Sequence, residues 1–168
     1  GLAAAGLHVY DGHLHDLSPK ERRKQWERTM EEVRTFQNEL VKDGLPVPGL
    51  VAGGTPTFPF HAGMDGTECS PGTTLLWDAG YGSKFPDLEF QLAALVLTRV
   101  ISKPGANHVT LDLGHKAIAS ENPHPRVRFI GLENCEATVH SEEHLTLKGK
   151  RTASLKVGDC LYGIPMHI

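Results

Sequence analysis

The apolar positions in the first quarter of the chain form one short run and one long periodic stretch. Residues 7–10 are a brief apolar run next to glycine, which predicts a buried strand. From residue 19, apolar side chains recur at steps of three and four, while Lys, Arg and Glu fill the opposite face, which predicts an amphipathic helix with its charged residues toward solvent. Ser18, Pro19 and Glu21 mark its start as a capping box, and Asp43-Gly44 marks its end. Its apolar side, which we expect to face a core, consists of Trp26, Met30, Val33, Phe36 or Gln37, and Leu40.

A second strand is predicted over residues 48–52, and it leads directly into the turn Gly53-Gly54-Thr55. A strand, a helix and a strand joined by short loops form the βαβ unit of a parallel sheet. Residues 68–78 again place a turn of small residues beside a strand.

The pattern changes after Pro86, where no second long helical period is found. Short strands separated by Gly, Pro, Asn and charged turns are predicted over residues 93–102, 109–113, 127–130, 145–147 and 159–162. We therefore expect an α/β fold in which residues 1–86 form a parallel α/β part and residues 87–168 form a mostly β domain.

Composition narrows the choice of partners. The formal net charge is −3, and acidic and basic residues are interspersed, so no continuous cationic surface for nucleic acid is expected. No apolar run approaches the roughly 18 to 20 residues of a membrane span. Cys69, Cys135 and Cys160 lack CxxC spacing, which favours reduced thiols in a cytoplasmic protein, each packed as a small hydrophobe. We expect a small-molecule substrate.

Both ends of the sequence indicate a piece of a longer chain. It opens without a methionine on the approach to a strand, and it closes on the apolar stretch of residues 163–168. Domain termini are usually frayed and polar, so we expect a fragment.

Two turns of small residues are candidates for anion binding. Gly53-Gly54-Thr55 follows a predicted parallel strand, where successive glycines let backbone N–H groups approach an anion and the threonine adds a hydroxyl donor. Ser70-Pro71-Gly72-Thr73 is a second such turn, and consecutive loops at one barrel face can converge on one phosphate. Taken alone, the first turn is more typical of a glycine turn that leaves a strand, and the second turn shifts the balance toward a phosphate-bearing ligand.

Ten histidines supply further candidate chemistry. His13 and His15 in "YDGHLHD" have the His-x-His spacing with which metal-dependent hydrolases bind a divalent ion, although such a pair is also common in solvated loops. His167 follows Pro165 at a strand-like end. Polar clusters, which are typical of solvated faces, occur at His115-Lys116 and over residues 140–144.

Six motifs, taken together, resemble a known family: "GLHVYDGH", "GGTPTF", "ECSPGTTLLWDAGY", "LDLGHKAIASENP", "HSEEHL" and "GIPMHI". In this order, and over nearly the whole chain, they resemble the D-threonine aldolase and D-serine dehydratase-like family of fold type III enzymes, which use pyridoxal 5′-phosphate (PLP). The resemblance implies the C-terminal part of a (β/α)8 PLP barrel, followed by a β-rich C-terminal domain and usually assembled as a homodimer.

The resemblance also implies roles for individual residues. Tyr10 would pack beside the cofactor, and a histidine shortly after it would act as base on the substrate hydroxyl, with His15 fitting slightly better than His13. The residues expected to hold the phosphate are Gly54, Thr55, Gly72 and Thr73.

A divalent metal ion and a lysine complete the implied site. His167 matches the first metal ligand, and the second would be residue 169, where a thiolate would favour zinc, our first choice, and a carboxylate manganese or magnesium. The lysine that holds PLP lies in a Pro-His-x-Lys-Thr context in this family, and no such context occurs here. Lys116 is the only lysine within a resembling motif, and it lies in the β-rich part, so the chain alone is expected to be inactive.

We therefore expect a PLP-dependent, metal-assisted lyase of D-β-hydroxy amino acids. Retro-aldol cleavage and elimination of water both remain open from the sequence. The alternatives are a hydrolase that binds metal through His13 and His15, and a non-catalytic relative that only binds the cofactor.

Overall fold

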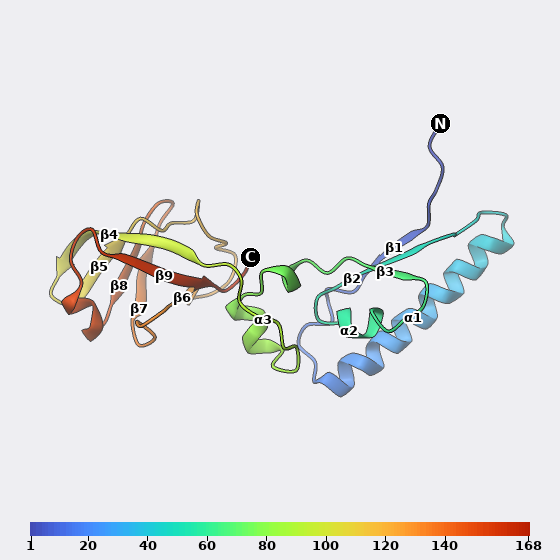
Figure 1. Cartoon of the computed structure of the whole chain (residues 1–168), viewed down its shortest axis with the longest axis horizontal. Coiled ribbons are helices and arrows are strands. Elements are labelled where there is room, and N and C mark those ends of the chain that lie inside the picture. Colours follow the sequence, from blue (N-terminus) through green and yellow to red (C-terminus); the bar gives the residue numbers. More distant parts are fainter. The chain divides into compact units, whose positions relative to one another are not determined.

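A computed structural model describes residues 1–168, and the chain divides into two compact units, Gly1–Thr74 and Leu75–Ile168. Figure 1 shows the elements of both units. Each unit is described here by itself. The domain boundary expected near residue 86 lies further along the chain than this division and stays a prediction.

The first unit is a parallel three-stranded sheet with helical connections. Its elements are β1 (Leu7–Tyr10), α1 (Pro19–Lys42), β2 (Leu50–Gly53), α2 (Phe58–His61) and β3 (Thr67–Cys69). The strand order is β1-β2-β3 with both pairs parallel, as the predicted βαβ unit requires. The carboxyl ends of the three strands therefore meet at one edge of the sheet, and the loops that follow them lie there.

Helix α1 begins and ends where its sequence signals predict. The Ser18 Oγ accepts from the Glu21 backbone N–H, and the Glu21 carboxylate accepts from the Ser18 N–H, so the predicted capping box is confirmed. The hydrogen bonds from Ser18 hold the pKa of Glu21 below its usual value. Asp43 caps the other end, and its N–H donates to the Glu39 carbonyl.

The apolar side of α1 is nearly as predicted. Met30 is buried, and Gln37 is half-buried whereas Phe36 is 52% exposed, so Gln37 rather than Phe36 lies on the packed side. One prediction was wrong. Arg22, expected with the other charged residues on the solvent side, is fully buried, because it lies one turn before Trp26 on the packed side of the helix.

The second unit is an antiparallel sheet preceded by two short helical turns. A 3₁₀ turn at Thr73–Leu75 spans the division between the units, and α3 (Ala79–Lys84) follows. The strands are β4 (Val96–Gly105), β5 (His108–Leu111), β6 (Val127–Phe129), β7 (Glu136–His140), β8 (Leu145–Lys148) and β9 (Cys160–Pro165), with a further 3₁₀ turn at Lys150–Ser154. They pair in the order β6-β9-β4-β5-β8-β7, every pair antiparallel, and the sheet curls on itself.

Five of these strands correspond to the predicted ones, and β7 was not predicted. The concave side of the curled sheet holds one apolar cluster, whose buried members are Val100, Val109, Leu111, Leu113, Ile118, Val127, Phe129, Leu132, Leu145, Leu147 and Leu161. The mostly β character expected of this part of the chain is thus confirmed.

The cysteines differ in exposure. All three are free thiols, and burial raises the pKa of Cys69 and of Cys135. Cys160, expected to be buried, is exposed because its side chain points to the outer face of β9. Among the helices, none combines the length and the apolar character that crossing a membrane would need.

Candidate cofactor site and its surroundings

The two turns of small residues predicted to bind an anion meet in the structure. Gly53 ends β2, so Gly54 and Thr55 begin the loop at the carboxyl edge of the sheet. The Thr73 backbone N–H donates to the Thr55 Oγ1 at 3.3 Å, which joins the second turn to the first. Sequence reasoning placed both turns at one edge, and the hydrogen bond brings them into contact.

Unused backbone donors are concentrated in these turns. The N–H groups of Gly54, Thr55 and Gly72 make no hydrogen bond within the chain, although Gly54 and Thr55 are buried residues. Buried N–H groups in proteins almost always have an acceptor. Clustered N–H groups at the end of a parallel strand suit a phosphate group, so the residues present fit the phosphate of PLP.

Tyr10 lies across the neighbouring glycines at the end of β1. A Cβ on Gly12 would lie 2.1 Å from the Tyr10 Oη, and one on Gly53 would lie 3.2 Å from its Cδ2. The ring thus occupies space that only glycine leaves open, and it is 73% exposed in this chain. His8, two residues earlier on the same exposed face, bonds through Nε2 with the Ser70 Oγ at 3.1 Å.

A buried polar network lies directly behind the glycine turn, and sequence reasoning missed it. The Thr57 Oγ1 donates to the Asp11 Oδ1 at 2.6 Å, and the His61 Nε2 bonds with the Asp11 Oδ2 at 3.1 Å. These three side chains are 0%, 4% and 1% exposed. The only signal in the sequence is the position of Asp11 directly after a strand that ends in a candidate cofactor residue.

Trp26 determines the protonation of this network. Its indole Nε1–H donates to the His61 Nδ1 at 3.1 Å. Because an indole can only donate, Nδ1 must accept, and the proton of His61 resides on Nε2. His61 is therefore neutral and donates to the Asp11 carboxylate.

The two histidines predicted as bases differ in their contacts. His15 donates from Nδ1 to the Gly12 carbonyl at 3.1 Å, and its Nε2 lies 3.1 Å from the Asp16 Oδ2, so both nitrogens are engaged. His13 is exposed and has no hydrogen-bond partner within the chain. No group of three His, Cys, Asp or Glu side chains suited to a metal ion gathers around them or elsewhere in the chain.

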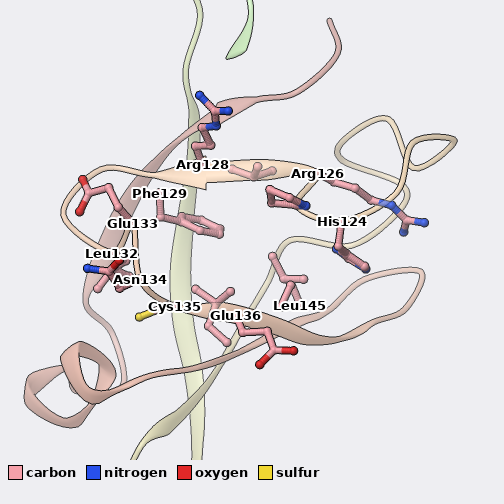
Figure 2. A pocket seen from close by; sticks show the side chains of 14 residues that line it. His124, Arg126, Arg128, Phe129, Leu132, Glu133, Asn134, Cys135, Glu136 and Leu145 are labelled. Atoms are coloured by element: carbon pink, nitrogen blue, oxygen red, sulfur yellow. The ribbon is translucent and has the colours of Figure 1, made fainter. Parts of the chain in front are cut away.

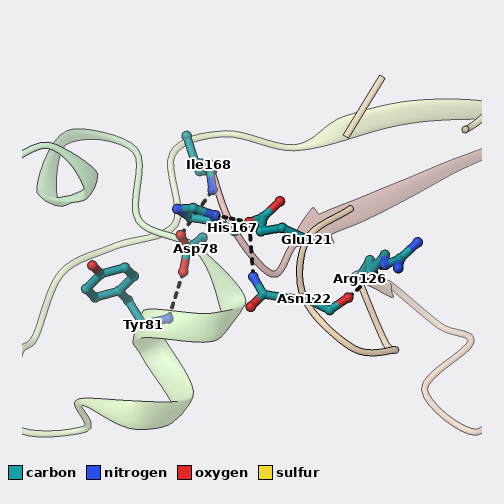
Figure 3. Close-up of polar contacts among 7 residues, drawn as sticks. All are labelled: Asp78, Tyr81, Glu121, Asn122, Arg126, His167 and Ile168. Atoms are coloured by element: carbon teal, nitrogen blue, oxygen red, sulfur yellow. Dashed lines mark hydrogen bonds and ion pairs between the residues drawn. The ribbon is translucent and has the colours of Figure 1, made fainter. Parts of the chain in front are cut away.

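The predicted metal ligand His167 lies in the second unit, in a network of its own (Figure 3). Its Nδ1 contacts the Glu121 Oε1, and this imidazole holds the pKa of Glu121 below its usual value. Next to it, the Ile168 N–H donates to the Asp78 Oδ2 at 3.2 Å, while the Asp78 Oδ1 caps α3 by accepting from the Tyr81 N–H at 2.7 Å. The contact with Glu121 leaves the Nε2 of His167 for a metal ion, the arrangement in which a carboxylate orients a ligating histidine.

The polar clusters of the second unit, expected as solvated faces, are partly ordered around Arg126. Its Nη1 donates to the His115 Nε2 at 3.2 Å and to the His140 Nδ1 at 3.0 Å. The pKa of His140 is lowered, mainly by burial and further by the charges of neighbouring groups that include Arg126. Burial also lowers the pKa of His124. Lys116 pairs with Glu142 and Glu143 at 3.3 and 3.1 Å and is 62% exposed, as expected for a solvated cluster.

A cavity of about 680 Å³ opens between the edge strands β6 and β7 (Figure 2). Its lining includes Phe129, Leu132 and Leu145 from the apolar cluster. None of the residues predicted for the active site lines it. It is the gap that remains where the curled sheet does not close.

Comparison with known proteins identifies the fold first. The chain superimposes on the crystal structure of D-threonine aldolase from Filomicrobium marinum with a TM-score of 0.82 and 25% identity, covering 99% of this chain and 46% of that one. D-threo-3-hydroxyaspartate dehydratase from Delftia sp. HT23 shares the fold, with a TM-score of 0.74 and 20% identity over 97% of this chain and 49% of that one. An alanine racemase from Clostridium difficile 630 also matches, with a TM-score of 0.60. The chain thus has the fold of the alanine racemase-like PLP enzymes, with barrel strands followed by the β domain.

The sequence comparisons point to the same group of proteins. Residues 93–168 match the putative serine dehydratase domain. A D-threonine aldolase from Arthrobacter sp. is 27% identical over 173 residues, which cover 100% of this chain and 45% of that protein. The chain is a homologue of D-threonine aldolase, and it spans less than half the length of the relatives it matches. The resemblance that the six motifs predicted is confirmed.

Proposed function

We propose that the protein containing this chain is a PLP-dependent lyase that cleaves or dehydrates D-β-hydroxy amino acids with the help of a divalent metal ion. The observation that carries the proposal is the contact between the Thr55 and Thr73 turns, with their unused N–H groups, in a homologue of D-threonine aldolase. We further propose a homodimer in the cytoplasm, by analogy with the family.

In this proposal the first unit holds the cofactor. The phosphate would be bound by the backbone N–H groups of Gly54, Thr55 and Gly72, with the Thr55 and Thr73 hydroxyls beside them, and Tyr10 would pack against the ring. When bound, PLP accepts the electron pair that the breaking substrate bond releases. The lysine that anchors PLP in the family is not among these residues.

A histidine would remove the proton from the substrate hydroxyl. His15 has Nδ1 engaged with the Gly12 carbonyl and Nε2 3.1 Å from the Asp16 Oδ2, so it must break one of these contacts to reach a substrate hydroxyl. His13 is exposed and makes no hydrogen bond within the chain. Either histidine can serve as the base, and replacing each in turn with glutamine shows which one does.

The metal ion would lower the pKa of the substrate hydroxyl, which is otherwise a poor acid and a poor leaving group. His167 supplies one ligand through Nε2, and Glu121 holds its ring in place. Nowhere in residues 1–168 do three metal-binding side chains gather at one place. The remaining ligands would therefore come from outside these residues or from substrate and water.

The test uses the whole polypeptide that contains this chain, loaded with PLP. D-threonine, D-threo-3-hydroxyaspartate and D-serine are supplied with the L-isomers as controls, and the products are quantified. Glycine with an aldehyde indicates retro-aldol cleavage, whereas ammonia with a keto acid indicates elimination. A protein that binds PLP but converts none of these D-amino acids would contradict the proposal.

The roles of the histidines and the metal are tested on the same protein. Replacing the true base by glutamine should lower kcat by about 10²- to 10⁴-fold, the usual contribution of general base catalysis, and the other replacement should have little effect. Chelation should abolish activity, and re-addition of zinc, manganese or magnesium identifies the metal. Equal, small effects of His13→Gln and His15→Gln would exclude both as the base.

A further inference from the structure

The buried network of Asp11, Thr57, His61 and Trp26 is connected to the glycine turn by direct contact. Gly54 has φ +123°, and a Cβ placed on it would lie 1.9 Å from the Asp11 Oδ1 and 2.8 Å from the Thr57 Oγ1. The backbone of Gly54 therefore lies directly against these two side chains. Only glycine permits both this approach and this φ.

The network also controls which way the turn presents its N–H groups. The single hydroxyl hydrogen of Thr57 is shared: it donates to the Asp11 Oδ1 at 2.6 Å and, as the longer branch, to the Gly54 carbonyl oxygen at 3.2 Å. In a trans peptide the C=O and the next N–H point to opposite sides. Holding the Gly54 carbonyl toward Thr57 thus directs the Thr55 N–H, which has no acceptor within the chain, away from the network.

Three elements position Asp11 for this task. Asp11 itself follows β1, His61 ends α2 and Trp26 belongs to α1, so the network ties the sheet to both helices at the site. With His61 donating from Nε2, the Asp11 carboxyl group accepts from both His61 and Thr57. An ionised carboxylate beside the turn would repel a phosphate, so Asp11 is expected to act through orientation and not by attraction.

We propose that Asp11, Thr57, His61 and Trp26 are positioning residues that orient the Gly53-Gly54-Thr55 turn for the phosphate group of the cofactor without contacting the cofactor. The inference rests on the proposed function, because it assumes that the turn binds this phosphate. The role of the network would then be to raise the affinity for one chemical group, a phosphate monoester.

The test compares two probes on the full-length apoprotein. Pyridoxamine 5′-phosphate and pyridoxamine differ only in the phosphate, and neither forms a covalent bond with lysine. The dissociation constant of pyridoxamine divided by that of pyridoxamine 5′-phosphate, both measured by calorimetry, isolates the contribution of the phosphate, and this ratio is large when the phosphate is well bound. General loosening of the fold weakens both probes and leaves the ratio unchanged.

Thr57→Val should lower this ratio about tenfold, equivalent to losing roughly one good hydrogen bond to the phosphate. Thr57→Ser retains the hydroxyl and should restore it. Thr98→Val is the matched control, since Thr98 is 2% exposed and donates to the Asp112 carboxylate at 2.7 Å in the second unit. Its ratio should equal that of the wild type.

Asp11→Ala distinguishes orientation from charge. It removes both acceptors of the network together with any charge, so the turn loses its support and the ratio should fall; if charge dominated, removal of the repulsion would raise the ratio. A ratio that rises, or that Thr57→Val leaves unchanged, overturns the inference while the proposed function stands. A wild-type ratio near one overturns the proposed function together with the inference.

Discussion

The interior of residues 75–168 is mainly apolar, whereas that of residues 1–74 includes a larger share of polar side chains. Eleven buried apolar side chains form a single cluster inside the curled sheet. In the first unit the fully buried side chains include Arg22, Thr57 and His61, with Met30 the large apolar exception.

The two interiors illustrate two roles that a buried side chain can have, one in stability and one in fixing the geometry of a loop. Apolar burial is non-directional and tolerates exchange of similar volumes. A buried polar network is directional, because each donor needs its acceptor and an unmatched group is costly. We conclude that the second unit derives stability from its interior, and that the first unit uses part of its interior to hold loop geometry.

Emptying the apolar cluster should have the largest effect. Leu111 is 0% exposed, and Leu111→Ala should reduce the free energy of unfolding of the second unit by about 2–5 kcal/mol, because a cavity remains. Leu97→Ala on the outer face, at a side chain 59% exposed, should change it by no more than about 0.5 kcal/mol. Urea unfolding followed by Trp77 fluorescence in a Trp26→Phe background measures both, and equal effects would show that the cluster is not tightly packed.

The next effect concerns the glycine turn. Gly54→Ala should destabilise the first unit by more than the roughly 1–2 kcal/mol that a left-handed conformation costs, because the new Cβ meets Asp11. Gly66→Ala is the control, since Gly66 also has a positive φ (+73°) but no atom within 4 Å of the Cβ position. Trp26 fluorescence in a Trp77→Phe background reports the unfolding. If the two substitutions cost the same, the contact with Asp11 is not sterically limiting.

A smaller effect is expected at the start of α1. Ser18→Ala removes the N-cap hydroxyl and should cost the first unit about 1 kcal/mol. Asn38→Ala, at an exposed position inside the same helix, should be neutral or slightly stabilising because alanine has the higher helix propensity. The same fluorescence assay applies, and a neutral Ser18→Ala would mean that packing alone fixes the start of the helix.

The smallest effect is a pH dependence of the second unit. The pKa values of His140 and His124 are lowered from 6.5 in the folded state, so below this pH the unfolded chain binds more protons than the folded one. The stability of the second unit should therefore be complete above 6.5 and fall as the pH drops below it. Thermal unfolding between about pH 7.5 and 5.5 measures the slope, which His140→Gln should reduce. An unchanged slope in that variant would assign the effect to other groups.

The predictable features were those encoded by neighbouring residues. The capping box of α1 requires only Ser18 and Glu21, and both glycine turns follow recognisable strands. Strand β7 was missed because a register shift between Ala137 and Val139 breaks the alternation that marks a strand.

The positioning network was missed because its members are distant in sequence. His61 and Asp11 are separated by 50 positions, and nothing near either residue indicates the other. Their pairing depends on where β1 and α2 lie once the sheet has formed. The identities of the turn residues were therefore readable from sequence, while the side chains that support the turn were not.

The contact between Tyr10 and Gly12 has a consequence for directed evolution of this protein. Gly12 is neither fully buried nor a candidate catalytic residue, so a designer would regard it as free to vary. Any other amino acid would displace the phenol ring, because its Cβ would lie 2.1 Å from the Tyr10 Oη. Because Tyr10 is exposed, its ring can turn aside, so a saturation library should record position 12 as tolerant in stability and as altered only in properties that depend on where the Tyr10 ring lies.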